Sequence, residues 1–204
     1  LHGHYIVCGF GRVGRNVANE LTTTHRHFVA IDADEAVMEA HRERLPGLVY
    51  LNGDASDDDL LIAAGIEDAH GVFAVTGDDS RNLMIVFTAK QLNPNIRIVA
   101  RCHEVRNTEK LRKAGADSVI SPDFTGGMRI ASSMIRPHVV SFLDEMLRSE
   151  HKLRLEEVLV PLRFEPRALE TLCLRSPNYV MLAVRRGGDF VFNPPKEFML
   201  EPGQ

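Results

Sequence analysis

A glycine-rich segment and one carboxylate carry the clearest chemistry of this chain. The segment Gly9-Phe10-Gly11-Arg12-Val13-Gly14 directly follows the apolar run 5–8, and Asp32 closes the apolar run 28–31. In a strand–turn–helix unit, glycines at this spacing bring backbone amides against a pyrophosphate, and an acid at this distance accepts hydrogen bonds from ribose hydroxyls. The spacing therefore predicts a Rossmann βαβ unit that binds an adenine nucleotide.

The three glycines have separate roles in this prediction. Gly9 permits the tight turn from strand to helix, Gly11 lets the backbone approach the pyrophosphate, and Gly14 lets the helix pack closely on the strand. We expect the helix to begin near Val13, with the unpaired amides of its first turn facing the phosphates.

Asp32 also predicts which nucleotides fit. Its carboxylate accepts hydrogen bonds from the adenosine ribose and repels a phosphate on the 2′ oxygen, so NAD(H), ADP and ATP are expected and NADP is not. The alternative is a purely structural role, in which Asp32 caps a helix that begins near Asp34.

Two arginines favour a pyrophosphate or polyphosphate ligand. Arg12 lies beside the helix N-terminus, where a cation adds charge-assisted hydrogen bonds, and Arg101 ends the fifth apolar run and is expected to point into the same crevice. Structural alternatives stay open for both. Arg12 could bond to carboxylates of a neighbouring subunit, and Arg101 could pair with Glu104 or Asp123.

Short apolar runs alternate with helical patterns over the first 122 residues. Continuous apolar strands separated by helices predict an α/β fold with a doubly wound parallel sheet, buried on both faces. The expected strands are 5–8, 28–31, 48–51, 72–75, 96–100 and 118–120. Residues 1–122 are thus predicted to form a nucleotide-binding domain.

The pattern changes after Pro122. Gly126-Gly127 opens an apolar-faced helical pattern that Pro137 interrupts, which predicts a hinged helix pair over 123–150 that packs against another subunit. The alternative is a crossover onto the chain's own sheet. Alternating apolar residues over 155–160 and 179–184, with turns at 176–178, 187–188 and 193–195, predict a small β-rich domain over 151–204 that looks truncated.

Composition excludes several classes of function. A net charge of −4 with scattered Lys and Arg indicates no nucleic acid partner. Three cysteines without a CxxC pair are expected to be reduced, and no apolar stretch is long enough for a membrane span. A start at Leu1 rather than Met favours an excised fragment.

Three further groups are assigned structural roles. Asp57-Asp58-Asp59 resembles a metal cluster but is expected to cap a helix, and His2 and His4 are expected to belong to a linker. No metal site is predicted.

The motifs together resemble an RCK domain, also called KTN or TrkA-N, the regulatory module of prokaryotic potassium channels and uptake systems. The resemblance covers nearly the whole chain and depends on the order of its motifs. These are the residues 8–15 around the glycine loop, Gly53-Asp54-Ala55, the segment 111–117 with 119–122 after it, and Asn193-Pro194-Pro195.

This resemblance implies site residues and partners. The adenine is expected near Asp54-Ala55, and Thr76-Gly77 with Asn82 is expected to close over the other end of the nucleotide. The family also implies a homodimer through the helices after Gly126, a tetrameric or octameric ring, and a potassium pore N-terminal to the chain at the cytoplasmic face of a membrane.

The resemblance raises the question of metal ions as well. Some relatives bind calcium just after the fifth strand, where this chain has Arg101 and His103, so that calcium site is expected to be absent. A divalent ion linked to the nucleotide near Asp123 stays conceivable.

The fold alone does not separate a sensor from an enzyme. An NAD-dependent oxidoreductase needs a substrate domain with a catalytic acid or base, and the residues after Pro122 offer no such group by spacing. A ligand-gated regulatory domain is therefore favoured over an enzyme. A third possibility is a free regulatory subunit that associates with a potassium transporter.

Overall fold

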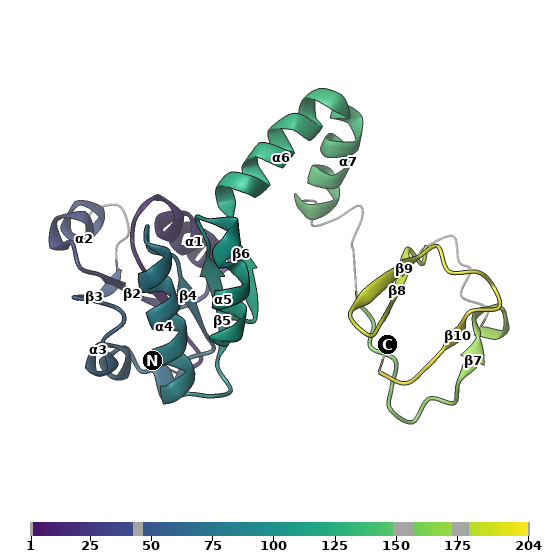
Figure 1. Ribbon diagram of the computed structural model, residues 1–204, viewed down its shortest axis with the longest axis horizontal. Coiled ribbons are helices and arrows are strands. Elements are labelled where there is room, and N and C mark those ends of the chain that lie inside the picture. The colour runs from purple at the N-terminus through teal and green to yellow at the C-terminus, as the bar shows by residue number, and fades with distance from the viewer. Residues whose placement is uncertain (1, 43–46, 149–156, 173–179, 204) are drawn as a thin grey trace. The chain divides into compact units, whose positions relative to one another are not determined.

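The chain forms two compact units, Leu1–Val140 and Ser141–Gln204. The computed structural model describes residues 2–42, 47–148, 157–172 and 180–203. The positions of the two units relative to one another are not determined (Figure 1). The domain boundaries predicted at residues 122 and 150 stay predictions.

The first unit is built on a six-stranded parallel sheet with the strand order β3-β2-β1-β4-β5-β6. Its strands are β1 (Tyr5–Cys8), β2 (Phe28–Asp32), β3 (Val49–Asn52), β4 (Gly71–Ala74), β5 (Arg97–Arg101) and β6 (Ser118–Ile120). Central β1 pairs in register with both β2 and β4, with Ile6 opposite Val29 on one side and Val72 on the other. This order reverses direction between β1 and β4, which confirms the predicted doubly wound α/β fold.

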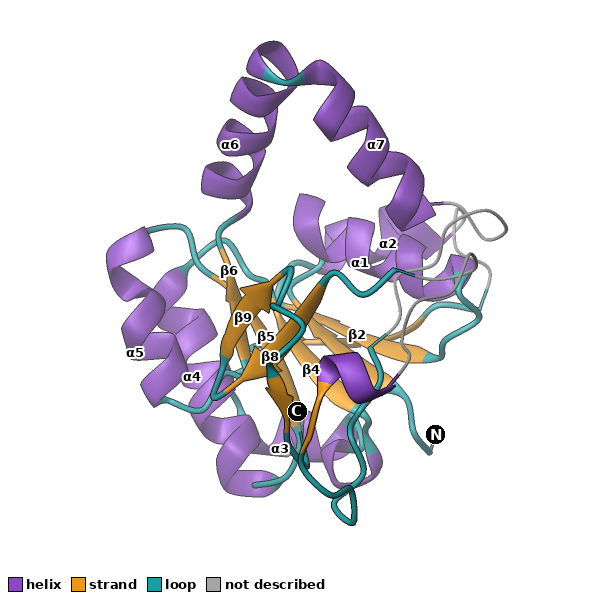
Figure 2. Ribbon diagram, turned by 90° about the vertical axis from the view of Figure 1, so that its right-hand side faces the viewer, coloured by secondary structure: helices purple, strands orange, loops and turns teal. Residues whose placement is uncertain are grey.

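Helices cover the sheet on both faces. Figure 2 shows α1 and α2 on one face and α4 and α5 on the other, while α3 packs beside α4. The bounds are α1 (Arg12–Thr23), α2 (Glu35–Arg42), α3 (Asp58–Ala63), α4 (Asp79–Leu92) and α5 (Thr108–Lys113), with single 3₁₀ turns at Ile66–Asp68 and Val105–Asn107. Because both faces are covered, the central strands are apolar in succession: Ile6, Val7 and Cys8 are all fully buried.

The N-terminal histidines differ from expectation. His4 was expected in a linker, but its ring is buried and its Nε2 lies 2.8 Å from the carbonyl oxygen of Ala64, at the end of α3. A carbonyl can only accept, so Nε2 carries the proton. The linker prediction is wrong for His4, because its Nε2 bonds to a partner sixty residues away that the local sequence does not reveal. His2 is exposed and lies 3.3 Å from Asp68.

Two helices follow the sheet. α6 (Pro122–Ile135) begins four residues before the predicted start at Gly126, because Pro122 suits the first helical position, where its missing N–H has no partner to lose. α7 begins at Pro137 (Pro137–Arg148), and the nonhelical Arg136 separates the two helices as the hinge prediction required. None of the described helices is both long enough and apolar enough to cross a bilayer.

The second unit contains two small antiparallel ladders. β7 (Arg167–Ala168) pairs with β10 (Met199–Leu200), and β8 (Ala183–Arg186) pairs with β9 (Asp189–Phe192) across the predicted turn at Gly187-Gly188. The prediction of a strand over 155–160 is wrong for residues 157–160, the part that the structure describes, because these residues carry no ladder hydrogen bonds. The strand predicted from 179 begins only at Ala183. The turn predicted at 176–178 and Cys173 lie outside the described residues.

Candidate functional site

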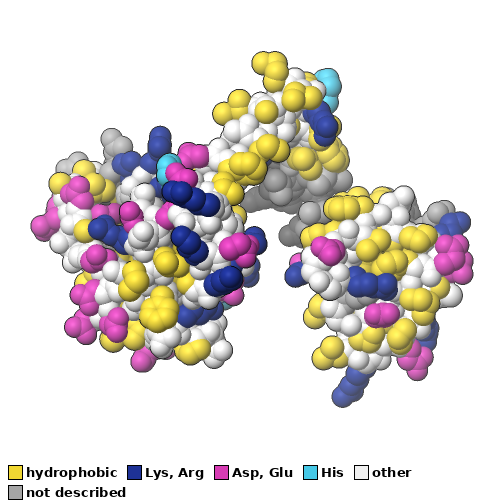
Figure 3. Space-filling view, in the orientation of Figure 1, with side chains coloured by type: hydrophobic (Ala, Val, Ile, Leu, Met, Phe, Trp, Pro, Cys, Tyr) yellow, Lys and Arg dark blue, Asp and Glu magenta, His cyan; other side chains and the backbone are white. Residues whose placement is uncertain are grey.

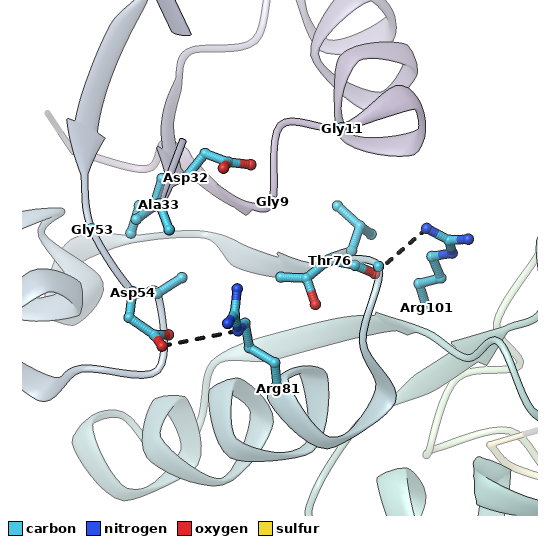
Figure 4. A pocket seen from close by; sticks show the side chains of 13 residues that line it. Gly9, Gly11, Asp32, Ala33, Gly53, Asp54, Thr76, Arg81 and Arg101 are labelled. Carbon is cyan, nitrogen blue, oxygen red and sulfur yellow. Dashed lines mark hydrogen bonds and ion pairs between the residues drawn. The ribbon is translucent and has the colours of Figure 1, made fainter. Parts of the chain in front are cut away.

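A crevice of about 240 Å³ opens at the carboxyl ends of the strands, where the strand order reverses (Figure 4). Ligands of open α/β sheets bind at this position. Eight of the predicted site residues line it, together with five that were not predicted. The predicted ones are Gly9, Gly11, Asp32, Asp54, Ala55, Thr76, Gly77 and Arg101, and the others are Ile31, Ala33, Gly53, Val75 and Arg81.

The glycine loop has almost no room for a Cβ atom at Gly9 or Gly14, but it has open space for one at Gly11. Gly9 has φ +97°, and a Cβ there would lie 2.8 Å from the backbone of Thr76. A Cβ on Gly14 would lie 1.8 Å from the carbonyl oxygen of Gly9. A Cβ on Gly11 would meet nothing within 4 Å, so the loop leaves space beside the N-terminus of α1. That space suits a pyrophosphate.

Asp32 holds the glycine loop in place. One carboxylate oxygen accepts a 2.5 Å hydrogen bond from the backbone N–H of Phe10, and the other accepts from the N–H of Asp34 at 2.9 Å. The first turn of α2 is capped by Asp34, which accepts from Ala36 at 3.0 Å. The capping role considered for Asp32 therefore belongs to Asp34, and Asp32 faces the crevice with lone pairs left for ribose hydroxyls.

Five predicted site residues do not line the crevice. Phe10 is fully buried in a cluster with Ala18 and Ala30, so only its backbone faces the loop. Arg12 is an exposed residue at the start of α1, and Val13 and Gly14 lie behind it in the helix. The fifth residue is Asn82.

Asn82 acts as a structural connector. Its buried amide accepts from the N–H and hydroxyl of Thr76 at 2.9 and 2.7 Å, and donates to the carbonyl oxygen of Arg101 at 3.0 Å. It thus joins the ends of β4 and β5 beneath the crevice. The family resemblance implied that Asn82 lies near the nucleotide, but its burial in α4 makes it a support for residues that line the site.

Arg101 points toward the crevice from the end of β5 (Figure 4). Its Nη1 lies 3.5 Å from the carbonyl oxygen of Thr76, and its buried Nε has no hydrogen-bond partner within the described part of the chain. The two acids considered as its partners pair elsewhere: Glu104 lies 3.9 Å from Arg106, and Asp123 lies 3.2 Å from His103. A guanidinium that lines the crevice, with the two nearby acids paired elsewhere, favours an anionic ligand here.

Arg81 was missed by sequence reasoning. It lies in the first turn of α4, and its Nε is 3.9 Å from a carboxylate oxygen of Asp54, across the crevice from Gly11 (Figure 4). The signal was available, because a cation is unfavourable in a first helical turn unless it has another role. Hydrogen bonds from the N–H and hydroxyl of Ser56 hold the pKa of Asp54 below its usual value, with Arg81 adding to the effect.

A second missed residue is Asp79, which fixes the loop after β5. Its carboxylate accepts hydrogen bonds from the N–H groups of His103 and Glu104 at 2.7 and 3.0 Å and from the side chain of Asn107 at 2.8 Å. Burial raises the pKa of Asp79, but these hydrogen bonds outweigh it, so the pKa lies below its usual value. The charged form is therefore the one that stabilises the fold.

We expect Asp79→Ala to lower the free energy of unfolding by about 1–2 kcal/mol at pH 7, because it leaves donors without their charged acceptor. A lowered pKa in the folded state means that this stability is present above the unfolded pKa of about 3.9 and is lost as pH falls through the folded value. Urea unfolding from pH 7 to 3 should show the gap between wild type and variant closing. A constant gap would contradict this prediction, and the exposed Asp58→Ala is the control.

The acidic run beside the site is a helix cap. Asp57 precedes α3 and accepts from the N–H of Asp59 at 3.3 Å, which confirms the capping prediction. Within the described residues, no three His, Cys, Asp or Glu side chains are grouped so that they could hold a metal ion. Cys8 and Cys102 are buried free thiols.

Comparison with known proteins agrees with this geometry. The family model described as the TrkA-N domain matches residues 5–122, which are the six strands and the helices between them. This chain belongs to the TrkA-N family. The resemblance to an RCK domain of the TrkA-N type is thereby confirmed.

Two relatives match along the whole chain. "Potassium channel protein 1" of Methanocaldococcus jannaschii is 36% identical over 205 residues, and "Probable potassium channel protein 2" of the same organism is 34% identical over 212 residues. Each alignment covers 100% of this chain and 62% of the relative, so the chain spans less than two thirds of their length. A solved structure titled "GsuK channel bound to NAD" is 26% identical with a TM-score of 0.59, covering 99% of this chain and 35% of that one.

Proposed function

We propose that this chain is a cytoplasmic ligand-sensing domain that binds an adenine nucleotide and regulates potassium transport. The observation that carries the proposal is the crevice itself, in which open space at Gly11, the carboxylate of Asp32 and the side chain of Arg101 face a common volume. The potassium channel relatives and the NAD-bound GsuK channel support both the ligand class and the transported ion.

In this proposal the charged groups of the site position the nucleotide. Its pyrophosphate lies over Gly11 at the N-terminus of α1, with Arg12 and Arg101 as countercharges. Its ribose hydroxyls donate to Asp32, which excludes NADP by repulsion. The adenine lies toward Asp54 and Ala55. NAD(H), ADP and ATP all meet these requirements. A divalent ion bound beside the phosphates would lie near Asp123, in the first turn of α6.

In this proposal the nucleotide regulates transport by binding one state of the gate more tightly than the other, and it is not chemically changed. To move a gate from 1:99 to 99:1, ligands must favour one state by about 5.5 kcal/mol, which is about 0.7 kcal/mol for each of eight sites in a ring. In this proposal the domains assemble as a tetrameric or octameric ring below a pore that precedes the chain. Small changes in contact at each crevice are then sufficient.

The proposed dimer depends on α6 and α7. Five large apolar side chains of α6 are more than half exposed: Phe124, Met128, Ile130, Met134 and Ile135 (Figure 3). Ile130 and Met134, one helical turn apart, are 76% and 85% exposed. An apolar face of this kind marks a partner surface. A second copy of this chain is the proposed partner.

We expect the double substitution Ile130→Asp with Met134→Asp to convert the dimer to a monomer, because two buried carboxylates would cost several kcal/mol at the interface. Light scattering on a sizing column measures this directly. The exposed Ser133→Asp adds a similar charge outside the apolar face and should stay dimeric. A dimer that survives the double substitution would rule out this interface.

The rival function is an NAD-dependent oxidoreductase. Among the described residues that line the crevice, the ionisable ones are Asp32, Asp54, Arg81 and Arg101, and each carboxylate already accepts hydrogen bonds from the backbone. None is a His, Lys or Tyr placed to exchange a proton with a substrate. A sensor therefore fits these lining residues better than a dehydrogenase.

Calorimetric titration with NAD, NADH, ADP, ATP and NADP tests the proposal. We expect binding of at least one of the first four and much weaker binding of NADP. No binding of any nucleotide would refute it. Incubation with NADH and a panel of carbonyl compounds tests the rival, since turnover of NADH would make the protein an enzyme. The sequence upstream of Leu1 distinguishes a channel domain, preceded by a pore, from a free subunit.

A further inference from the structure

An ion pair joins two walls of the crevice. Arg81 extends from the first turn of α4, and Asp54 lies in the turn after β3, the strand at the edge of the sheet. The Arg81 Nε and the Asp54 Oδ2 are 3.9 Å apart, and each side chain is 49% exposed (Figure 4). The Arg81 guanidinium thus contacts Asp54 on one side and is open to the crevice on the other.

Both ends of this pair are anchored. The backbone N–H of Arg81 donates to Asp78 at 2.7 Å, and the Oδ1 of Asp54 accepts from the N–H and hydroxyl of Ser56 at 2.9 and 2.8 Å. The hydroxyl of Thr88 donates to the carbonyl oxygen of Ser56 at 3.2 Å, which holds α4 against the same turn. The backbone of Arg81 and the carboxylate of Asp54 are therefore both held in place, and the ion pair directs the half-exposed Arg81 side chain toward Asp54.

The pair lies on the adenosine side of the crevice. Asp54 follows β3 and Arg81 opens α4, which covers the face of the sheet opposite α1. The phosphate-binding N–H groups lie at the start of α1, beside Gly11. In Figure 4 Arg81 points toward Asp54 and lies apart from Gly11. Asp54 is a charged partner that the structure gives Arg81, whereas no ion pair is described for Arg101.

Small apolar side chains line the crevice beside Asp54. Ala33 and Ala55 are among its lining residues, as is Arg81. A crevice lined by small apolar side chains and by a planar, weakly hydrated cation suits a flat aromatic ring. Guanidinium groups stack on such rings, and nucleic acid bases use the same contact.

We propose that Arg81 is a base-contacting residue, whose guanidinium plane covers one face of the adenine while Asp54 holds it in place. This inference rests on the proposed function, because it requires a nucleotide in the crevice. It adds a determinant for the base, whereas the glycine loop, Asp32 and Arg101 recognise phosphate and ribose.

Titrations of Arg81→Ala and Arg81→Lys with AMP and ADP test this role, with inorganic pyrophosphate as a competitor. A lost stacking contact should weaken AMP and ADP by the same factor, about fivefold to thirtyfold, and leave pyrophosphate competition unchanged. Arg81→Lys should lose most of the same affinity, because an ammonium keeps the charge without the plane. Arg112→Ala, which removes another exposed arginine paired with Glu109 at 3.0 Å, is the matched control and should bind normally.

Three results would overturn the inference. A loss that is larger for ADP than for AMP would assign Arg81 to phosphate, and full affinity in Arg81→Lys would show that only its charge matters. If Arg81→Ala kept both its affinity and its melting temperature, Arg81 would not contact the ligand. Wild-type protein that binds none of these probes would instead refute the proposed function, so the two failures are distinguishable.

Discussion

Gly14→Ala is expected to destabilise the first unit by at least about 3 kcal/mol and to abolish nucleotide binding. The added Cβ would lie 1.8 Å from the carbonyl oxygen of Gly9, which is backbone and cannot rotate away. Either α1 moves off β1 or the loop opens, and both changes remove the amides that face the phosphates. Urea unfolding and titration with NAD and ADP measure the two effects.

Gly11→Ala is the matched control for this substitution. Gly11 has φ −65°, which alanine adopts without strain, and its added Cβ would contact nothing within 4 Å. Stability should therefore stay within about 0.5 kcal/mol of wild type. Affinity should fall by about tenfold or more, since the methyl group occupies space that the pyrophosphate needs. If Gly14→Ala were as stable as Gly11→Ala, the packing explanation would be wrong.

Asp32→Ala is expected to weaken NAD and ADP by about tenfold to a hundredfold, because charged hydrogen bonds to the ribose are lost. It should also narrow the preference for NAD over NADP, since the charge that repels a 2′-phosphate is gone. Parallel calorimetric titrations with NAD and NADP give both quantities. Some destabilisation is expected as well, because the N–H of Phe10 loses its acceptor.

Asp34→Ala provides the comparison for Asp32. Asp34 is also an acid after β2, but it caps α2 through Ala36. Its loss should lower stability by about 1 kcal/mol and leave nucleotide preference unchanged. An Asp32→Ala variant that kept wild-type affinity and discrimination would show that this carboxylate only supports the loop.

The fold was predictable because its signals are local. Most strands of the sheet are largely apolar runs, and the helix start at Asp57 follows general capping rules. The glycine loop was predictable from its local spacing, and Gly14 answers a steric demand from Gly9 within the same loop. The close approach at Gly9 comes from the backbone of Thr76, a distant contact that the prediction did not use.

The missed residues depend on contacts between distant parts of the chain. Arg81 reaches Asp54 from another element, Asp79 binds N–H groups more than twenty residues away, and His4 bonds to Ala64. Arg81 carried a local signal as a cation in a first helical turn, but nothing within a short window distinguishes Asp79 or His4 from a solvated side chain. The small β ladders were misplaced for a related reason, because two-residue strands such as Arg167–Ala168 form only when their partner is already in place.

The contact between His103 and Asp123 places the root of α6 next to the loop that follows Arg101. α6 is 14 residues long and so extends about 21 Å from that root. A tilt of about 5° at Pro122 would carry its far end about 2 Å, by the proportions of a rigid rod of that length. A tilt too small to disturb the sheet would thus move the far end of α6 far enough to change a contact with a neighbouring subunit.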